Sequence, residues 1–120
     1  MKNIAPDIIR QRLLIEGYYN IDVNKDIIEK YLNGVARHLD LRTYGEAIIY
    51  SPSPETGREE NLGFDSFIPL IDSGISLYIW SRAGFFSVIL YSCKNFDKMS
   101  AVNYTKEFFQ CRDNIVHLSF

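Results

Sequence analysis

Residues 74–92 read GISLYIW-SRAG-FFSVILYS and contain the strongest secondary-structure signal of the chain. Two runs rich in β-branched and aromatic residues flank four turn residues, a pattern typical of a β-hairpin. We place the turn between Arg82 and Ala83, so that Trp80 faces Phe85 and Gly74 faces Tyr91. Because side chains alternate between the faces of a sheet, this register sorts the hairpin residues into two sets.

One set is wholly apolar, and we expect it to pack on helices: Ile75, Leu77, Ile79, Phe86, Val88 and Leu90. The other set mixes aromatic and hydroxyl groups without any charge: Gly74, Ser76, Tyr78, Trp80, Phe85, Ser87, Ile89, Tyr91 and Cys93. A charge-free sheet face is not expected to face bulk water. We therefore expect a second subunit to cover it face to face, or a ligand site to lie on it. The same register places the Cys93 thiol close to the Asp72–Ser73 peptide bond.

Hydrophobic spacing outside the hairpin predicts two helices and four more strands. One helix covers residues 25–39 behind Asp22 or Asn24 as its N-cap, and Asp97 caps a second helix. The further strands are expected at residues 10–19, 43–50, 64–71 and 114–120, with a bulge or a strand edge at Pro69. The order β-α-β-β-β-β-α-β predicts an α+β fold, a two-layer sandwich whose antiparallel sheet carries two helices on one face.

Composition and charge exclude several classes of protein. The 120 residues, 47% hydrophobic and 23% charged, are typical of a single globular domain spanning residues 1–120. Thirteen basic against fifteen acidic residues argue against a nucleic-acid partner. The chain has no apolar run of membrane-spanning length and no secretion signal, so a cytoplasmic location without a membrane partner is expected.

The sequence leaves the role of one loop open and argues against a metal site. Residues 51–62, SPSPETGREENL, predict a solvated loop, either a mobile lid or a tolerated insertion. The only cysteines and histidines are Cys93, Cys111, His38 and His117. They lack the closely spaced ligand pairs of a structural metal site, so no metal is expected.

Residues 72–82, DSGISLYIWSR, resemble the motif E-S-H-I-S-I-H-T-W-P-E of the short bacterial and archaeal S-adenosylmethionine decarboxylases. In that family the motif is followed by a strand that ends in a cysteine. Cys93 falls twenty residues after Ser73, in family register without a gap. Residues 13–19 and both predicted helices are similar to the family more weakly, and the loop at 51–62 looks like an insertion.

The resemblance implies a self-cleaving decarboxylase of polyamine (spermidine) synthesis. The Ser73 hydroxyl would attack the carbonyl of Asp72, and elimination from the resulting ester would leave a pyruvoyl group at position 73. This cofactor would bind the amine of S-adenosylmethionine, or of a related amino acid, and accept electrons as carbon dioxide leaves.

The resemblance also implies roles for further residues. Cys93 would donate the proton to the product carbon, because a thiol pKa can be tuned near neutrality. Tyr78 stands where the family has its processing histidine, and Ser66 lies one place from the position of an upstream helper serine. Glu16 and Trp80 would contact the substrate.

Two positions depart from the family in a way that keeps two hypotheses open. Gly74 and Tyr78 replace histidines, and a tyrosine is a poor base at neutral pH, although it can donate a hydrogen bond to an oxyanion. The chain is therefore either an active pyruvoyl-dependent decarboxylase or a non-processing, catalytically inactive relative that acts as a binding partner or regulator. Both hypotheses predict a homodimer through the charge-free sheet face.

Overall fold

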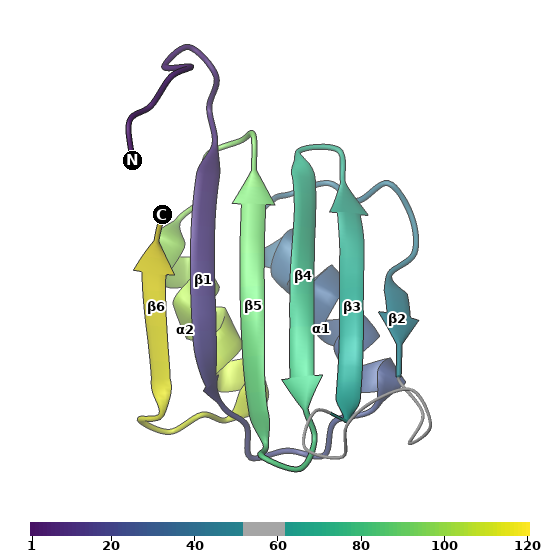
Figure 1. Cartoon of the computed structure of the whole chain (residues 1–120). Helices are drawn as coiled ribbons and strands as arrows, with labels where there is room; N and C mark the ends of the chain where they lie inside the picture. Colours follow the sequence, from purple (N-terminus) through teal and green to yellow (C-terminus); the bar gives the residue numbers. More distant parts are fainter. Residues whose placement is uncertain (52–61) are drawn as a thin grey trace.

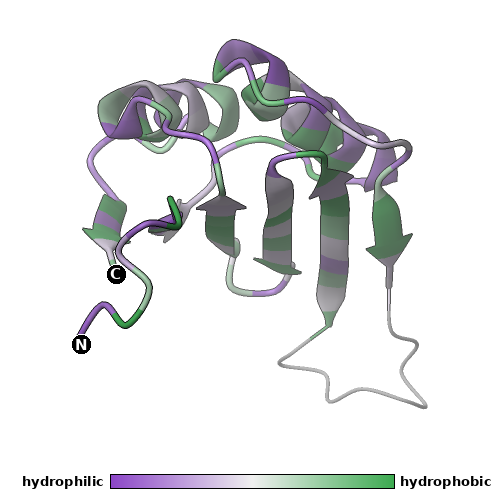
Figure 2. Ribbon diagram, turned by 90° about the horizontal axis from the view of Figure 1, so that it is seen from above, coloured by the Kyte–Doolittle hydropathy of each residue, from purple (hydrophilic) through white to green (hydrophobic). Residues whose placement is uncertain are grey.

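The computed structural model describes residues 1–51 and 62–120. Six antiparallel strands form one sheet in the order β2-β3-β4-β5-β1-β6, and both helices cover the same face (Figures 1 and 2). The elements are β1 Gln11–Tyr18, α1 Lys25–His38, β2 Ile48–Tyr50, β3 Gly63–Leu70, β4 Ser73–Trp80, β5 Phe85–Ser92, α2 Lys98–Phe109 and β6 Ile115–Ser119. The predicted fold class and element order are confirmed. The loop predicted at 51–62 lies, apart from its two ends, outside the described residues.

The central hairpin, β4–β5, has the register read from the sequence. Trp80 pairs with Phe85, Gly74 with Tyr91, and Ser73 with Ser92. All six residues assigned to the apolar set are at most 3% exposed, so this side of the hairpin packs against the helix layer. The hairpin therefore lies at the centre of both the sheet and the core.

Side-chain caps fix where both helices begin. The Asn24 side chain accepts a hydrogen bond from the Ile27 N–H (2.9 Å), and Asp97 accepts one from the Ser100 N–H (3.1 Å). The core side of α1 consists of Ile28, Tyr31, Leu32, Val35 and Ala36. The core side of α2 consists of Ala101, Val102, Thr105 and Phe109, with Phe108 partly buried. Neither helix in the described ranges has the length and hydropathy that a membrane span requires.

The second strand is shorter than the sequence predicts. Only residues 48–50 pair with β3, and Thr43 makes a single bridge to Leu70. The eight pairs between β3 and β4 run without a break, so Pro69 does not mark a bulge. Its carbonyl accepts the Tyr44 N–H (3.1 Å) beyond the end of β2, so its ring nitrogen faces away from β4 and interrupts no bond to that strand.

The side of the sheet turned away from the helices, called the open face below, carries the charge-free hairpin set together with alternate residues of the other strands. Its exposed apolar residues are Tyr18, Ile48, Tyr50, Phe67, Tyr91, Val116, Leu118 and Phe120. The only charged residues on the described strands of this face are Arg12, Glu16 and Asp65. The open face is thus broad, aromatic and sparsely charged.

Candidate active site

Ser73 and Cys93 meet at one end of the central hairpin. Ser73 is the first residue of β4, and Cys93 directly follows β5. The Ser73 Oγ lies 3.2 Å from the Cys93 Sγ, and the Cys93 N–H donates a hydrogen bond of 2.6 Å to the carbonyl oxygen of Asp72. The expectation that the Cys93 thiol lies close to the Asp72–Ser73 peptide bond is confirmed. A hydroxyl, a thiol and a polarised carbonyl are therefore next to one another.

The backbone of Ser73 is strained. Its φ of 139° lies in the region that favours glycine, and a residue with a side chain there costs about 1–3 kcal/mol. Ile75, two residues further along β4, faces the helices, so a regular strand would turn the Ser73 side chain to that side as well. Instead the hydroxyl contacts Cys93. The strain thus lies at the peptide bond that the resemblance marks for cleavage.

Two ion pairs flank this arrangement. Arg42 Nη2 lies 3.3 Å from Asp72 Oδ1, and the Arg42 N–H donates to Asp72 Oδ2 (3.3 Å). These two hydrogen bonds hold the pKa of the Asp72 carboxyl below its usual range. On the other side, Lys94 Nζ donates to the carbonyl oxygen of Asp40 (2.8 Å) and to its Oδ2 (3.2 Å).

Sequence reasoning missed Arg42, Asp40 and Lys94. The charged residues Asp40 and Arg42 after the first helix were the one available signal. Their presence does not reveal which distant residues they contact. Arg42 meets Asp72 across 30 residues of sequence, which no local spacing reveals.

Tyr78 and Glu16 lie elsewhere on the open face. Both pair with Ser87, so the three residues form one row across β1, β5 and β4, which Asp65 extends into β3. Tyr78 is five residues from Ser73 along β4, or about 17 Å at the rise of an extended strand. It lines a shallow hollow of about 310 Å³ with Phe67 and Asp65, whereas Glu16 lines another of about 280 Å³. Within one chain the structure does not bring these two residues to Ser73.

Ser66 and Trp80 are also remote from Ser73. The Ser66 side chain is buried, and its hydroxyl donates to the Leu77 carbonyl (2.8 Å). Leu77 belongs to the helix-covered set and is four residues from Ser73 along β4. Trp80 lies at the turn end of the hairpin, where its ring packs 5.3 Å from that of Phe85. Neither residue reaches the Ser73–Cys93 pair of its own chain.

The ring of Phe67 fills the space beside Gly74. A Cβ atom built on Gly74 would collide with Cε1 and Cζ of this ring. The position at which the resembling family has a histidine is thus occupied from the neighbouring strand, and a side chain at residue 74 requires the Phe67 ring to move.

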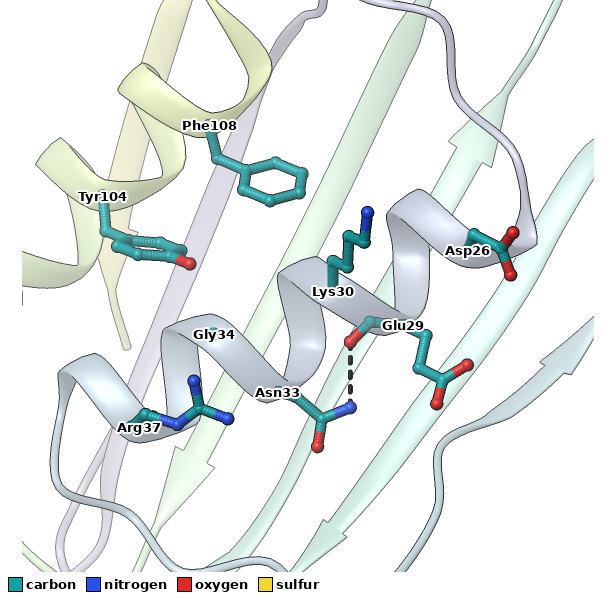
Figure 3. Close-up of a pocket in the computed structure, with 8 residues that line it drawn as sticks. All are labelled: Asp26, Glu29, Lys30, Asn33, Gly34, Arg37, Tyr104 and Phe108. Carbon is teal, nitrogen blue, oxygen red and sulfur yellow. Dashed lines mark hydrogen bonds between the residues drawn. The ribbon is translucent and has the colours of Figure 1, made fainter.

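A separate groove of about 620 Å³ lies between the two helices (Figure 3). Its α1 wall includes Lys30 and Arg37, and its α2 wall includes Tyr104 and Phe108. The Tyr104 hydroxyl lies against Gly34, in the space that a Cβ atom would need. Asp26 and Glu29 also line it, so its basic and acidic residues balance. It belongs to the helix layer and not to the open face, and it therefore lies apart from the Ser73–Cys93 pair.

Comparison with known proteins yields an informative structural likeness. No protein-family model matches the sequence, and no curated protein matches it. Among solved structures, the chain is similar to the crystal structure of the adenosylmethionine decarboxylase from Aquifex aeolicus VF5. The TM-score is 0.72 at 20% sequence identity, over 94% of this chain and 89% of that chain. At this identity the likeness establishes the fold: the chain has the two-layer fold of an adenosylmethionine decarboxylase, as the motif at residues 72–82 predicted.

Proposed function

We propose that the chain cleaves itself between Asp72 and Ser73 and that the product decarboxylates S-adenosylmethionine or a related amino acid. The observation that carries this proposal is that Cys93 contacts both the Ser73 hydroxyl and the Asp72 carbonyl, next to the strained backbone of Ser73. The fold shared with a protein described as an adenosylmethionine decarboxylase supports it. The motif around Ser73 supports it independently of the fold.

The cleavage step uses groups that are already in place. The Ser73 Oγ forms a bond to the carbonyl carbon of Asp72, the C–N bond breaks, and the hydroxyl proton passes to the freed amine. The Cys93 N–H points at the carbonyl oxygen on which negative charge develops, which is the geometry of an oxyanion donor. Elimination then transfers the Ser73 Cα proton to water, breaks the Ser73 Cβ–O bond and releases the Asp72 carboxylate. The dehydroalanine that remains takes up water and loses ammonia, which leaves a pyruvoyl group.

The residues present fit such a group. Ser73 is its source, and the Cys93 thiol lies within 3.2 Å of the Ser73 side chain as a proton donor to the product. When formed, the group binds the substrate amine covalently and withdraws electrons as carbon dioxide leaves. Tyr91, paired with Gly74 on the open face, offers an aromatic surface on which a substrate can lie.

A homodimer through the open face belongs to this proposal. Since Tyr78 lies about 17 Å from the Ser73 of its own strand, only a second copy can bring a Tyr78 to that serine. In this dimer the two-fold axis would lie between the facing sheets and pass over β4 near Ser76, at a right angle to the strand. The two copies of β4 would then run in opposite directions, with each Tyr78 opposite the Ser73 of the other copy. The row of Glu16, Ser87 and Tyr78 would then join the site from the facing sheet.

The first test is the mass of the purified chain under denaturing conditions. We expect two fragments, residues 1–72 and residues 73–120, the second beginning with a pyruvoyl group. Ser73→Ala should leave the chain intact, whereas Ser76→Ala, a serine of the same strand, should still cleave. A wild-type chain that stays intact after long incubation contradicts the proposal.

The dimer is tested separately by sedimentation at micromolar concentration. We expect a dimer for the wild type and a monomer for Ile89→Glu, which places a charge at the centre of the open face. Lys30→Glu, on the helix layer, should remain dimeric. A monomeric wild type rules out the facing arrangement.

A second candidate is a non-processing relative that acts as a partner or regulator. It is favoured by the Phe67 ring, which fills the space that a side chain at residue 74 would need. An intact wild-type chain that changes the activity of an added adenosylmethionine decarboxylase would support it. Spontaneous cleavage of the wild type would rule it out.

A further inference from the structure

We propose that residues 40–44 form a clamp that holds the Asp72–Ser73 peptide bond in its cleavable geometry, with Arg42 as the positioning residue. The cleavage role of this clamp rests on the proposed self-cleavage. Its structural role does not, and the two are tested by different measurements below.

The clamp is anchored firmly in the core. Leu39 and Leu41, on either side of its first residue, are 7% and 4% exposed. The Leu41 N–H donates to the Ala36 carbonyl (2.8 Å), and Asp40 adopts a left-handed backbone with a φ of 57°. The chain therefore turns sharply out of α1, and the residues that follow Leu41 start from a fixed point.

From this anchor, the clamp runs beside the residues that precede Ser73. The Tyr44 N–H donates to the Pro69 carbonyl (3.1 Å), and the Ile71 N–H donates to the Arg42 carbonyl (2.9 Å). Arg42 then binds Asp72 twice, from its backbone N–H and from its guanidinium, each at 3.3 Å. Arg42 alone thus makes three hydrogen bonds to the two residues on the acyl side of the bond.

The other end of the clamp reaches the opposite strand. Asp40 accepts two hydrogen bonds from the ammonium group of Lys94, the residue after Cys93. Asp72 and Cys93 are themselves joined by the 2.6 Å bond between the Cys93 N–H and the Asp72 carbonyl. Residues 40–44 therefore hold together the two segments of the chain that meet at the candidate site, the one that ends at Asp72 and the one that continues from Cys93 to Lys94.

This arrangement explains how the strained backbone of Ser73 persists. A φ of 139° is held in place only where the surroundings over-determine it. The Asp72 side chain is 11% exposed although its partner Arg42 is 66% exposed, so the clamp covers the carboxylate while the arginine remains at the surface. Loss of the Arg42 side chain leaves the Asp72 carboxylate with the Arg42 backbone N–H alone, so Asp72 is held less tightly and its carbonyl leaves the Cys93 N–H more often.

The structural role is tested in the uncleavable Ser73→Ala background by hydrogen exchange of the Cys93 amide, which reports local opening at this bond. Adding Arg42→Ala should speed this exchange about tenfold, because the loss of one hydrogen bond between charged groups shifts a local opening equilibrium by about that factor. Arg42→Lys should restore part of the protection, and Arg37→Ala, an exposed arginine of α1, should change nothing. Because Arg42 lies at the surface, the melting temperature should hardly move. Unchanged Cys93 exchange in Arg42→Ala overturns the clamp.

The cleavage role is tested with Ser73 intact. Arg42→Ala should slow the appearance of the two fragments about tenfold, with the order of effects among the three arginine variants the same as in the exchange experiment. If the wild type does not cleave but Cys93 exchange still depends on Arg42, self-cleavage fails and the clamp's structural role stands. If the wild type cleaves and Arg42→Ala cleaves equally fast, the clamp's role in cleavage is wrong.

Discussion

The two sides of the β4–β5 hairpin are made by the same strands in the same register, yet they have opposite surroundings. On the helix-covered side, Phe86, Val88 and Leu90 are fully buried. On the open face, the alternating residues Phe85, Ile89 and Tyr91 are only partly covered, and Tyr91 is 39% exposed. The open side nevertheless carries no charge on either hairpin strand.

The two sides of the hairpin are therefore apolar for different reasons. The helix-covered side is apolar because the core requires it, as the stacking of Phe86 on Phe109 shows (ring centroids 4.4 Å apart). No element of the described chain covers the open face, so core packing does not account for its composition. Ser73 and Cys93, the residues of the candidate site, lie at one end of this hairpin. Their position agrees with the proposal that the open face binds a partner or a substrate.

The largest expected effect comes from breaking the helix-covered side. Phe86→Ala should reduce the free energy of unfolding by about 3–5 kcal/mol, because it leaves a cavity beneath Phe109. Phe85→Ala, one residue away on the open face, should cost much less, because Phe85 is only partly buried where it packs on the rings of Tyr18 and Trp80. Urea denaturation of both variants measures the comparison. Equal losses would show that the two faces do not differ in the isolated chain.

A smaller effect is expected where the open face is tightly packed. Gly74→Ala should cost about 1–3 kcal/mol, because the new Cβ collides with the Phe67 ring. Combining it with Phe67→Ala should recover most of this loss, so that a double-mutant cycle gives a favourable coupling. Additive losses from the two changes would show that the ring does not occupy the space beside residue 74.

The smallest effect concerns alkaline pH. Burial raises the pKa of the Cys111 thiol from 9.0 to about 11. The unfolded chain therefore loses this proton at lower pH than the folded chain. The contribution of the thiol to the free energy of unfolding is complete below pH 9 and is lost as the pH rises to 11. Cys111→Ala should flatten this decline in denaturation curves recorded between pH 8 and 11. An unchanged slope would mean that the thiol is not shielded from water in the folded chain.

Burial also raises the pKa of the Tyr31 hydroxyl, which contributes to the same alkaline decline. Tyr31→Phe should flatten the part of the curve above pH 10, at the cost of the 2.7 Å hydrogen bond to Thr105. A decline above pH 10 that Tyr31→Phe leaves unchanged would contradict this contribution of the Tyr31 hydroxyl.

Local sequence patterns predicted much of the fold. Alternation in residues 74–92 and the short turn predicted the hairpin register, and Asp97 was predicted as the cap of the second helix. The cap of the first helix was left open between Asp22 and Asn24, and the structure shows Asn24. The same alternation placed Cys93 at the Asp72–Ser73 bond. These predictions succeeded because each depends on neighbours in sequence or on a short turn.

Other features were beyond local patterns. The strand expected at residues 43–50 is reduced to its last three residues, because the bridge from Thr43 to Leu70 is out of register by two residues with the pairing of residues 48–50, so residues 44–47 do not continue the ladder. Ser66 resembles a processing residue by its place in the sequence, but pairing with Leu77 turns it toward the core. Both outcomes depend on partners far along the chain.

The sequence by itself determined the antiparallel two-layer fold and the meeting of Ser73 with Cys93, since alternation and turn length act over a few residues. Only the tertiary structure decided the clamp of Arg42 on Asp72 and the strained backbone of Ser73. These depend on how segments about 30 residues apart come together, and packing energy, not local spacing, decides that.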